Sequence, residues 1–94
     1  MFCVAVTFQV APDDHDRLVD RTLLFADASR REPGCDTFQP WSEHGQPGAI
    51  FLYEIYADRA AFDAHLAAPH FQSYNADIAP YLITKNVVTW DTQL

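Results

Sequence analysis

The sequence predicts an α+β fold in which a four-stranded antiparallel sheet carries its helices on a single face. Three observations predict this fold. The N-terminal segment alternates apolar with small or polar side chains, as a strand with one buried face does. Two later strand-like segments flank a turn-rich loop, which is typical of a hairpin. Helical spacing follows the first and third strands, and the resulting order of strand, helix, strand, strand, helix, strand is the split βαβ arrangement.

The first strand is expected from Phe2 to Val10. Its apolar face is made of Phe2, Val4, Val6, Phe8 and Val10. The opposite face is small and mildly polar, which suggests that it is also covered, for example by a second subunit. Asp13 is expected to cap a first helix from about Asp14 to Arg30, because acidic residues favour a helix N-terminus. Pro33 and Gly34 end this helix.

A hairpin is expected in the middle of the chain. Its first strand runs from Cys35 to Trp41, and Pro40 places the far end at an edge or a bulge. Residues 42–48 have the composition of a hairpin loop, and Ala49 to Tyr56 is the most strand-like segment. The composition leaves open which face of the strand from Ala49 to Tyr56 is buried, because both of its faces are apolar except at Glu54.

The C-terminal third predicts a broken helix and a last strand. Asp58 is expected to cap a short helix through Leu66, which Pro69 breaks. A second helical piece carries apolar side chains at helical spacing as far as Leu82, and Lys85 to Thr92 closes the sheet. A sheet with helices on one face leaves its other face to be buried elsewhere, so we expect a homodimer with the two sheets packed face to face.

Length and charge narrow the class of protein. The chain has 94 residues, which predicts one domain over residues 1–94. Six basic residues, of which Lys85 is the only lysine, face 13 acidic ones. This balance argues against nucleic acid and anionic membranes as partners. No apolar run approaches the roughly 18 residues of a membrane span, and no leader precedes the first strand, so we expect a cytoplasmic protein with its two cysteines reduced.

His65 and His70 are the sharpest candidates for chemistry. A histidine has an unperturbed pKa of about 6.5 and can exchange protons near neutral pH. Each could instead only cap or hydrogen-bond the helix break at Pro69. The five-residue separation of the two histidines across a proline matches no usual metal-ligand spacing, and there is no Gly-rich phosphate loop. We therefore predict no metal and no cofactor, and we expect Cys3 and Cys35 to be apolar filler.

Glu54 is the exceptional polar residue in an apolar strand. It is either a partly buried carboxylate with a raised pKa or one half of an ion pair or hydrogen bond, and the second arrangement is favoured. The available cations are Arg30, Arg31 and Arg59. Most aromatic side chains are expected in the core, and some of them also line a pocket.

Three runs of residues together resemble the antibiotic biosynthesis monooxygenase (ABM) family. The most specific run reads AFDAHLAAPHF. The matching residues are Glu32, Pro33, Gly34, Cys35 and Phe38; Phe51, Leu52, Tyr53 and Glu54; and Ala61, Phe62, His65, Leu66, Pro69, His70 and Phe71. The resemblance implies a dimeric, ferredoxin-like α+β barrel with a pocket between each sheet and its helices.

The resemblance leaves the reaction open, because members of this family oxidise phenols or hydroquinones with O₂, open haem, or only move protons. His65 and His70 match the branch of quinol monooxygenases and autoinducer-degrading isomerases. Haem-degrading members carry an asparagine and a tryptophan where this chain has Phe8 and His65, which argues against haem degradation. The asparagine and tryptophan pair of the polyketide-oxidising members has no counterpart that can be placed here.

These observations predict a cofactor-independent monooxygenase that acts with O₂ on a small phenolic, hydroquinone or polyketide-like substrate. His65 or His70 is the expected base. Phe8, Phe62, Phe71 and Tyr74 are the expected substrate-binding walls, and Tyr74 is expected to bond a substrate oxygen. The alternatives are a cofactor-free isomerase of a small keto or enol metabolite and a non-catalytic dimer that binds a small molecule.

Overall fold

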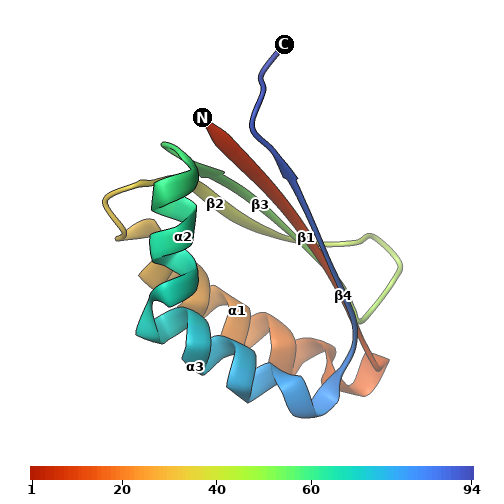
Figure 1. The fold of residues 1–94 in the computed structure, drawn as a ribbon. Helices are drawn as coiled ribbons and strands as arrows, with labels where there is room; N and C mark the ends of the chain where they lie inside the picture. The colour runs from red at the N-terminus through yellow and green to blue at the C-terminus, as the bar shows by residue number, and fades with distance from the viewer.

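The strands and helices lie in the predicted order in the computed structural model, which describes residues Met1 to Leu94 (Figure 1). The strands are β1 (Phe2–Val10), β2 (Cys35–Ser42), β3 (Ala49–Tyr56) and β4 (Leu82–Trp90). The α-helices are α1 (His15–Arg30), α2 (Arg59–Ala67) and α3 (Pro69–Ile78). Two 3-10 turns, Pro12–Asp14 and Ala79–Tyr81, connect β1 to α1 and α3 to β4. No helix has both the length and the apolar character needed to cross a membrane.

The four strands form one antiparallel sheet in the order β2-β3-β1-β4. The helices all lie on one face of this sheet (Figure 1). This is the ferredoxin-like split βαβ topology that the sequence predicts, and the fold class is confirmed.

The core lies between the sheet and the helices. As predicted, every second side chain of β1 is buried, from Phe2 to Val10. The faces of β3, which the sequence leaves open, are assigned by pairing with β1: Val4 faces Glu54 and Val6 faces Leu52. Glu54 therefore points toward the helices, into the core.

The element ends differ from prediction where proline interrupts the chain. Asp13, the expected cap, lies in the first 3-10 turn, and α1 begins only at His15. At the other end, α3 stops at Ile78, and a 3-10 turn that contains Pro80 precedes β4. Leu82, predicted to be helical, is thus the first residue of β4, because proline lacks the N–H that would continue the helix.

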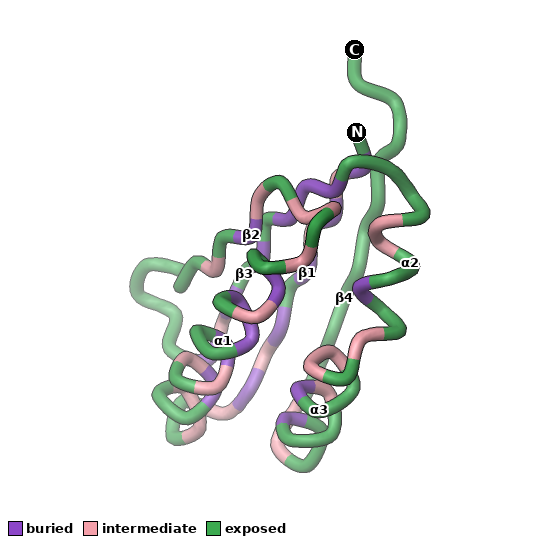
Figure 2. Tube along the Cα trace, turned by 90° about the vertical axis from the view of Figure 1, so that its left-hand side faces the viewer, coloured by how far each residue is buried: buried purple, intermediate pink, exposed green.

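The helices cover the sheet unevenly. Their main sheet contacts are those of α1 with β2 and of α2 with β3. Strand β4 packs along β1, and all its residues after Leu82 are exposed (Figure 2). The space between the sheet and the helices is therefore closed over β3 and open toward β4.

Candidate functional site

A small cavity lies between the sheet and the helices, at the side where helix cover ends. Its volume is about 50 Å³, and ten of its 14 lining residues are apolar. All four expected wall residues line it: Phe8, Phe62, Phe71 and Tyr74. His65, Glu54 and Lys85 supply charged or titratable groups. The cavity is thus an apolar space with a few polar groups, the usual composition of a small-molecule site.

The short helix α2 carries His65 into the core. Asp58 begins this helix as predicted, since its side chain accepts a hydrogen bond of 2.8 Å from the Ala61 backbone N–H. Gly34 allows the close approach of α2, because a Cβ at this position would lie 2.4 Å from the Cβ of Ala61. His65 is consequently only 1% exposed.

Glu32 joins the two histidines. Its Oε2 lies 2.8 Å from Nδ1 of His65 and 2.5 Å from Nε2 of His70. A carboxylate accepts hydrogen bonds, so these two ring nitrogens are the donors. The contact with Glu32 therefore leaves Nε2 of His65 as the unprotonated nitrogen of the neutral ring, and a carboxylate that fixes a tautomer in this way is a recurrent feature of histidine bases.

The two histidines are not equivalent. His65 lines the cavity, whereas His70 does not, and the side chain of His70 is 28% exposed against 2% for His65. His70 reaches the cavity only indirectly, through Glu32. The helix break at Pro69 separates the two residues along the chain, and their rings still lie with centroids 6.0 Å apart.

Glu32, His65 and His70 are also the three side chains that could hold a metal ion, with ligand atoms within 4.8 Å of one another. From the sequence, only the two histidines were considered as metal ligands. Two ligand atoms at about 2.1 Å from a tetrahedral zinc ion are separated by about 3.4 Å. The Glu32 oxygen is closer than this to both nitrogens, at 2.8 and 2.5 Å. In this arrangement the three side chains form a shared hydrogen-bond network, with spacings shorter than those of ligands around a bound zinc ion.

Glu54 lies at the closed end of the cavity and is 2% exposed. The Tyr56 hydroxyl donates to its Oε1 at 2.5 Å, and Nε2 of His65 lies 3.9 Å from the same oxygen. None of the expected arginines reaches it: Arg30, for example, donates to the Phe38 carbonyl and to Asp27. The hydrogen bond expected for Glu54 is therefore made by a tyrosine.

Burial shifts the proton affinities of both cavity groups. Desolvation raises the pKa of Glu54 to about 7, although the hydrogen bond from Tyr56 opposes the shift. Desolvation also lowers the pKa of His65, although its hydrogen bond to Glu32 favours the charged form. His65 is therefore held neutral and able to accept a proton, and Glu54 lies beside it with a pKa near neutrality.

Tyr74 offers its ring to the cavity, while its hydroxyl is already engaged. Its oxygen lies 2.7 Å from the Thr22 hydroxyl on α1, and its ring stacks on Phe25 with centroids 4.1 Å apart. The bond to a substrate oxygen that the sequence suggested for Tyr74 would have to compete with this buried contact.

Both cysteines are free and partly buried. Burial raises the pKa of Cys35 to about 11, and the neighbouring carboxylate of Glu32 adds to this effect. A thiol with this pKa is protonated at neutral pH and is a poor nucleophile, in keeping with the apolar filler expected from the sequence.

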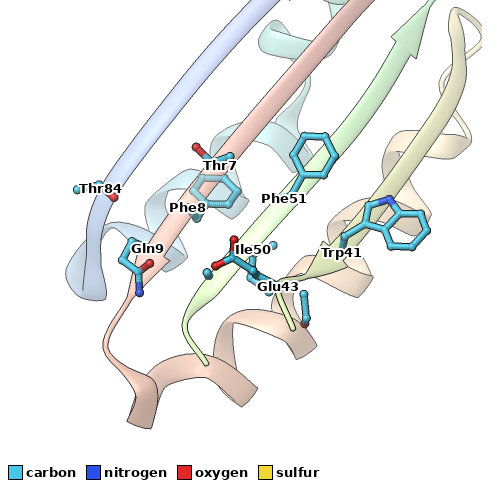
Figure 3. A pocket seen from close by; sticks show the side chains of 10 residues that line it. Thr7, Phe8, Gln9, Trp41, Glu43, Ile50, Phe51 and Thr84 are labelled. Carbon is cyan, nitrogen blue, oxygen red and sulfur yellow. The ribbon is translucent and has the colours of Figure 1, made fainter. Parts of the chain in front are cut away.

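The largest hollow of the molecule, about 630 Å³, lies on the opposite face of the sheet. Figure 3 shows its side chains standing on neighbouring strands, with Trp41 on β2 and Phe51 on β3. It holds no histidine, and it lies on the exposed face that the sequence predicts to be a subunit contact. The small cavity on the helix side, which combines an apolar lining with a base, is the better candidate for chemistry.

Sequence reasoning gave no role to two residues of the cavity region. Glu32 follows the end of α1, and its signal was its place before Pro33 and Gly34 in a run that matches the ABM family. Lys85 was noted only as the single lysine. The role of Glu32 could not be predicted, because its contact with His65 joins residues more than 30 positions apart. The role of Lys85 could not be predicted either, because it depends on the pairing of β4 with β1.

Comparisons with known proteins show what this chain is similar to. The family model described as antibiotic biosynthesis monooxygenase matches residues 1–77. A protein of Mycobacterium tuberculosis named "Putative monooxygenase Rv0793" is 33% identical over 88 residues, which are 92% of this chain and 86% of that protein. A crystal structure of an antibiotic biosynthesis monooxygenase has a TM-score of 0.93 at 25% identity, with full coverage of both chains.

A relative from Synechocystis sp., the uncharacterized protein sll1783, is 28% identical over 82 residues. The match includes 87% of this chain but only 55% of the relative, so the chain spans about half the length of that protein.

Proposed function

This chain belongs to the antibiotic biosynthesis monooxygenase family, and we propose that it is a monooxygenase that oxidises a small phenol or hydroquinone with O₂ without a cofactor. His65 is the base. Phe8, Phe62 and Phe71 hold the substrate ring in the cavity between the sheet and the helices.

One observation carries this proposal. A neutral histidine lies at the closed end of an apolar cavity, with Nδ1 bonded to Glu32 at 2.8 Å and with Nε2 left as the acceptor. Burial disfavours the imidazolium, whereas the carboxylates of Glu32 and Glu54 stabilise it once a proton has arrived. A base that is neutral at rest and supported when charged suits the removal of a phenolic proton.

The chemistry follows from the loss of that proton. The phenolate is a better electron donor than the phenol, and an apolar cavity strengthens this difference because water does not solvate the anion. For a hydroquinone, C₆H₆O₂ and O₂ give the hydroxyquinone C₆H₄O₃ and H₂O. One oxygen atom enters the ring, the other is reduced to water, and the substrate supplies the electrons.

Glu32 and His70 act on the base rather than on the substrate in this scheme. Glu32 fixes the ring of His65, and His70 donates to the same carboxylate oxygen. Both are positioning residues, so a His70 variant is expected to lose less activity than a His65 variant.

A homodimer forms part of the proposal. Large side chains on the face of the sheet away from the helices are exposed: Trp41, Phe51, Tyr53, Val88 and Trp90. A contiguous apolar surface of this kind is typical of a subunit contact. A second copy of the chain, packed sheet to sheet, would cover it. Sedimentation equilibrium is expected to show a dimer, and Tyr53→Glu is expected to give a monomer.

The experiment is O₂ uptake by protein treated with a chelator, measured over a panel of hydroquinones and polyphenols. We expect uptake by the unmodified chain and a loss of about 10²- to 10⁴-fold in His65→Gln, the range for a general base. His44→Gln is the matched control, since His44 is exposed in the loop between β2 and β3.

Full activity in His65→Gln would remove the assigned base. No uptake with any substrate, together with exchange of substrate protons with solvent in the absence of O₂, would identify the keto–enol isomerase instead.

A further inference from the structure

Lys85 is the only lysine of the chain and has an unusual position. It lies on β4 opposite Phe8 of β1 and lines the same cavity as His65. Its Nζ lies 5.8 Å from the ring centre of Phe8 and 5.6 Å from that of Phe71. The residue as a whole is exposed, yet its ammonium group is directed over the apolar cavity.

The ammonium group forms no close ion pair, and Glu54 of the same cavity acts on it only at longer range. Its one side-chain hydrogen bond is a long contact of 3.5 Å to Oδ1 of Asn75. No carboxylate lies within 4.0 Å of it, although the chain has 13 acidic residues. Exposed lysines normally extend their ammonium groups into water, and an ammonium group that loses water without a counter-ion is destabilised. Partial burial accordingly lowers the pKa of Lys85, although the charge of Glu54 opposes this shift.

The distance between this cation and the base limits what can lie between them. The ring centre of Phe71 lies 5.2 Å from the ring centre of His65 and 5.6 Å from Nζ of Lys85. The ring centre of His65 and Nζ are therefore no more than about 11 Å apart. For a substrate that lies in line between the two groups, with a hydrogen bond of about 3 Å at each end, the two bound oxygens are at most about 5 Å apart. This is the span of substituents across one benzene ring.

We propose that Lys85 forms an anion subsite, so that the substrate is a single-ring phenol bearing a carboxylate, with its hydroxyl at His65 and its carboxylate at Lys85. This inference rests on the proposed function for the identity of the reacting group. The cavity volume of about 50 Å³ is smaller than one ring needs, so binding even a single ring requires outward movement of the exposed side chains at the mouth, Leu66 and Val87. A cavity of 150 Å³ is known to hold benzene in another protein.

The competing role for Lys85 is structural, with its methylene stem covering Phe8 and Phe71. Two variants separate the roles. Lys85→Met keeps an unbranched apolar stem and removes the charge, whereas Lys85→Arg keeps the charge. Arg59→Met is the matched control, because Arg59 is exposed at the start of α2, outside the cavity lining, and its removal changes the net charge by the same amount.

The experiment is equilibrium binding without O₂, by calorimetry, of 2,5-dihydroxybenzoate and of its uncharged amide. The unmodified chain is expected to bind the acid at least 10-fold more tightly than the amide. Lys85→Met is expected to lose this preference through weaker binding of the acid, with the amide changed less than 2-fold. Lys85→Arg and Arg59→Met are expected to keep it.

Equal binding of acid and amide by the unmodified chain would overturn the subsite. So would an equal loss of both ligands in Lys85→Met, or an equal loss of acid binding in Arg59→Met. The two proposals fail separately: a charge preference without O₂ uptake refutes the oxygenase and keeps the subsite, whereas uptake with a neutral hydroquinone and no charge preference does the reverse.

Discussion

The two ends of the cavity differ in how they are covered. At the closed end, over β3, His65 is 1% and Glu54 is 2% exposed. At the open end, over β4, Leu66 is 38% and Val87 is 45% exposed. The helices pack on β2 and β3 and leave β4 uncovered. The uneven cover separates two requirements of a site, because groups that need a dry environment lie under the helices and a substrate can enter where the helices end.

If the closed end is part of the core, truncation there will destabilise the whole chain. Phe25 on α1 stacks on Tyr74 at 4.1 Å and has its ring centre 5.3 Å from that of Phe38 and 5.5 Å from that of His65. Phe25→Ala is expected to lower the free energy of unfolding by about 3–5 kcal/mol. Val87→Ala at the open end is the control and is expected to cost less than about 1 kcal/mol. Urea denaturation measures both, and similar losses would contradict the difference between the two ends.

The buried carboxylate at the closed end makes stability depend on pH. The pKa of Glu54 is about 7 in the folded chain against an ordinary value of 4.5. The folded state therefore binds more protons than the unfolded state in this window, and stability falls as pH rises from about 4.5 to above 7, by roughly 3 kcal/mol in total.

Glu54→Gln isolates this effect. The lowered pKa of His65 acts in the opposite direction, raising stability as pH increases toward 6.5, but it is present in both proteins. The difference in unfolding free energy between Glu54→Gln and the unmodified chain should therefore grow in favour of the variant between pH 5 and 8. A difference that stays constant with pH would show that Glu54 ionises as it does in the unfolded chain.

A smaller effect is expected from one hydrogen bond at the closed end. The Thr22 hydroxyl lies 2.7 Å from that of Tyr74, and both residues are 1% exposed. Thr22→Val leaves the tyrosine hydroxyl without a partner and should cost about 1–2 kcal/mol. Thr89→Val, on exposed β4, makes the same substitution and should stay within about 0.5 kcal/mol. Thermal unfolding distinguishes them, and equal shifts would mean that the buried bond adds nothing.

The sequence predicted the closed end less completely than the sheet that supports it. The alternation from Phe2 to Val10 identified the buried face of β1 because period two is a local property. The face of β3 is a matter of register, and pairing of Val4 with Glu54 decided it. His65 was singled out as a candidate base, but its partner Glu32 lies 33 residues away. Contacts of this kind leave no local pattern.

The sequence predicted still less about the open end of the cavity. Lys85 was visible only as the single lysine, and its place over the cavity depends on where β4 begins. The sequence predicted that start three residues late, at Lys85 instead of Leu82. The error arose because Leu82 continues the apolar spacing of α3, while the 3-10 turn around Pro80 ends the helix before it.

The smallest expected effect on stability is at the mouth, and it tests entry directly. Val87 and Val88 are neighbours on β4 with similar exposure, 45% and 39%, and only Val87 lines the cavity. Because successive side chains of a strand point to opposite faces, Val87→Phe narrows the mouth, whereas Val88→Phe adds the same bulk to the other face. Val87→Phe should raise the KM for O₂-dependent turnover severalfold with unfolding free energy unchanged within about 0.5 kcal/mol. Val88→Phe lies in the proposed subunit contact, so its oligomeric state is checked by sedimentation, and as a dimer it should leave KM unchanged. If both variants raise KM alike, the substrate does not enter the cavity past β4.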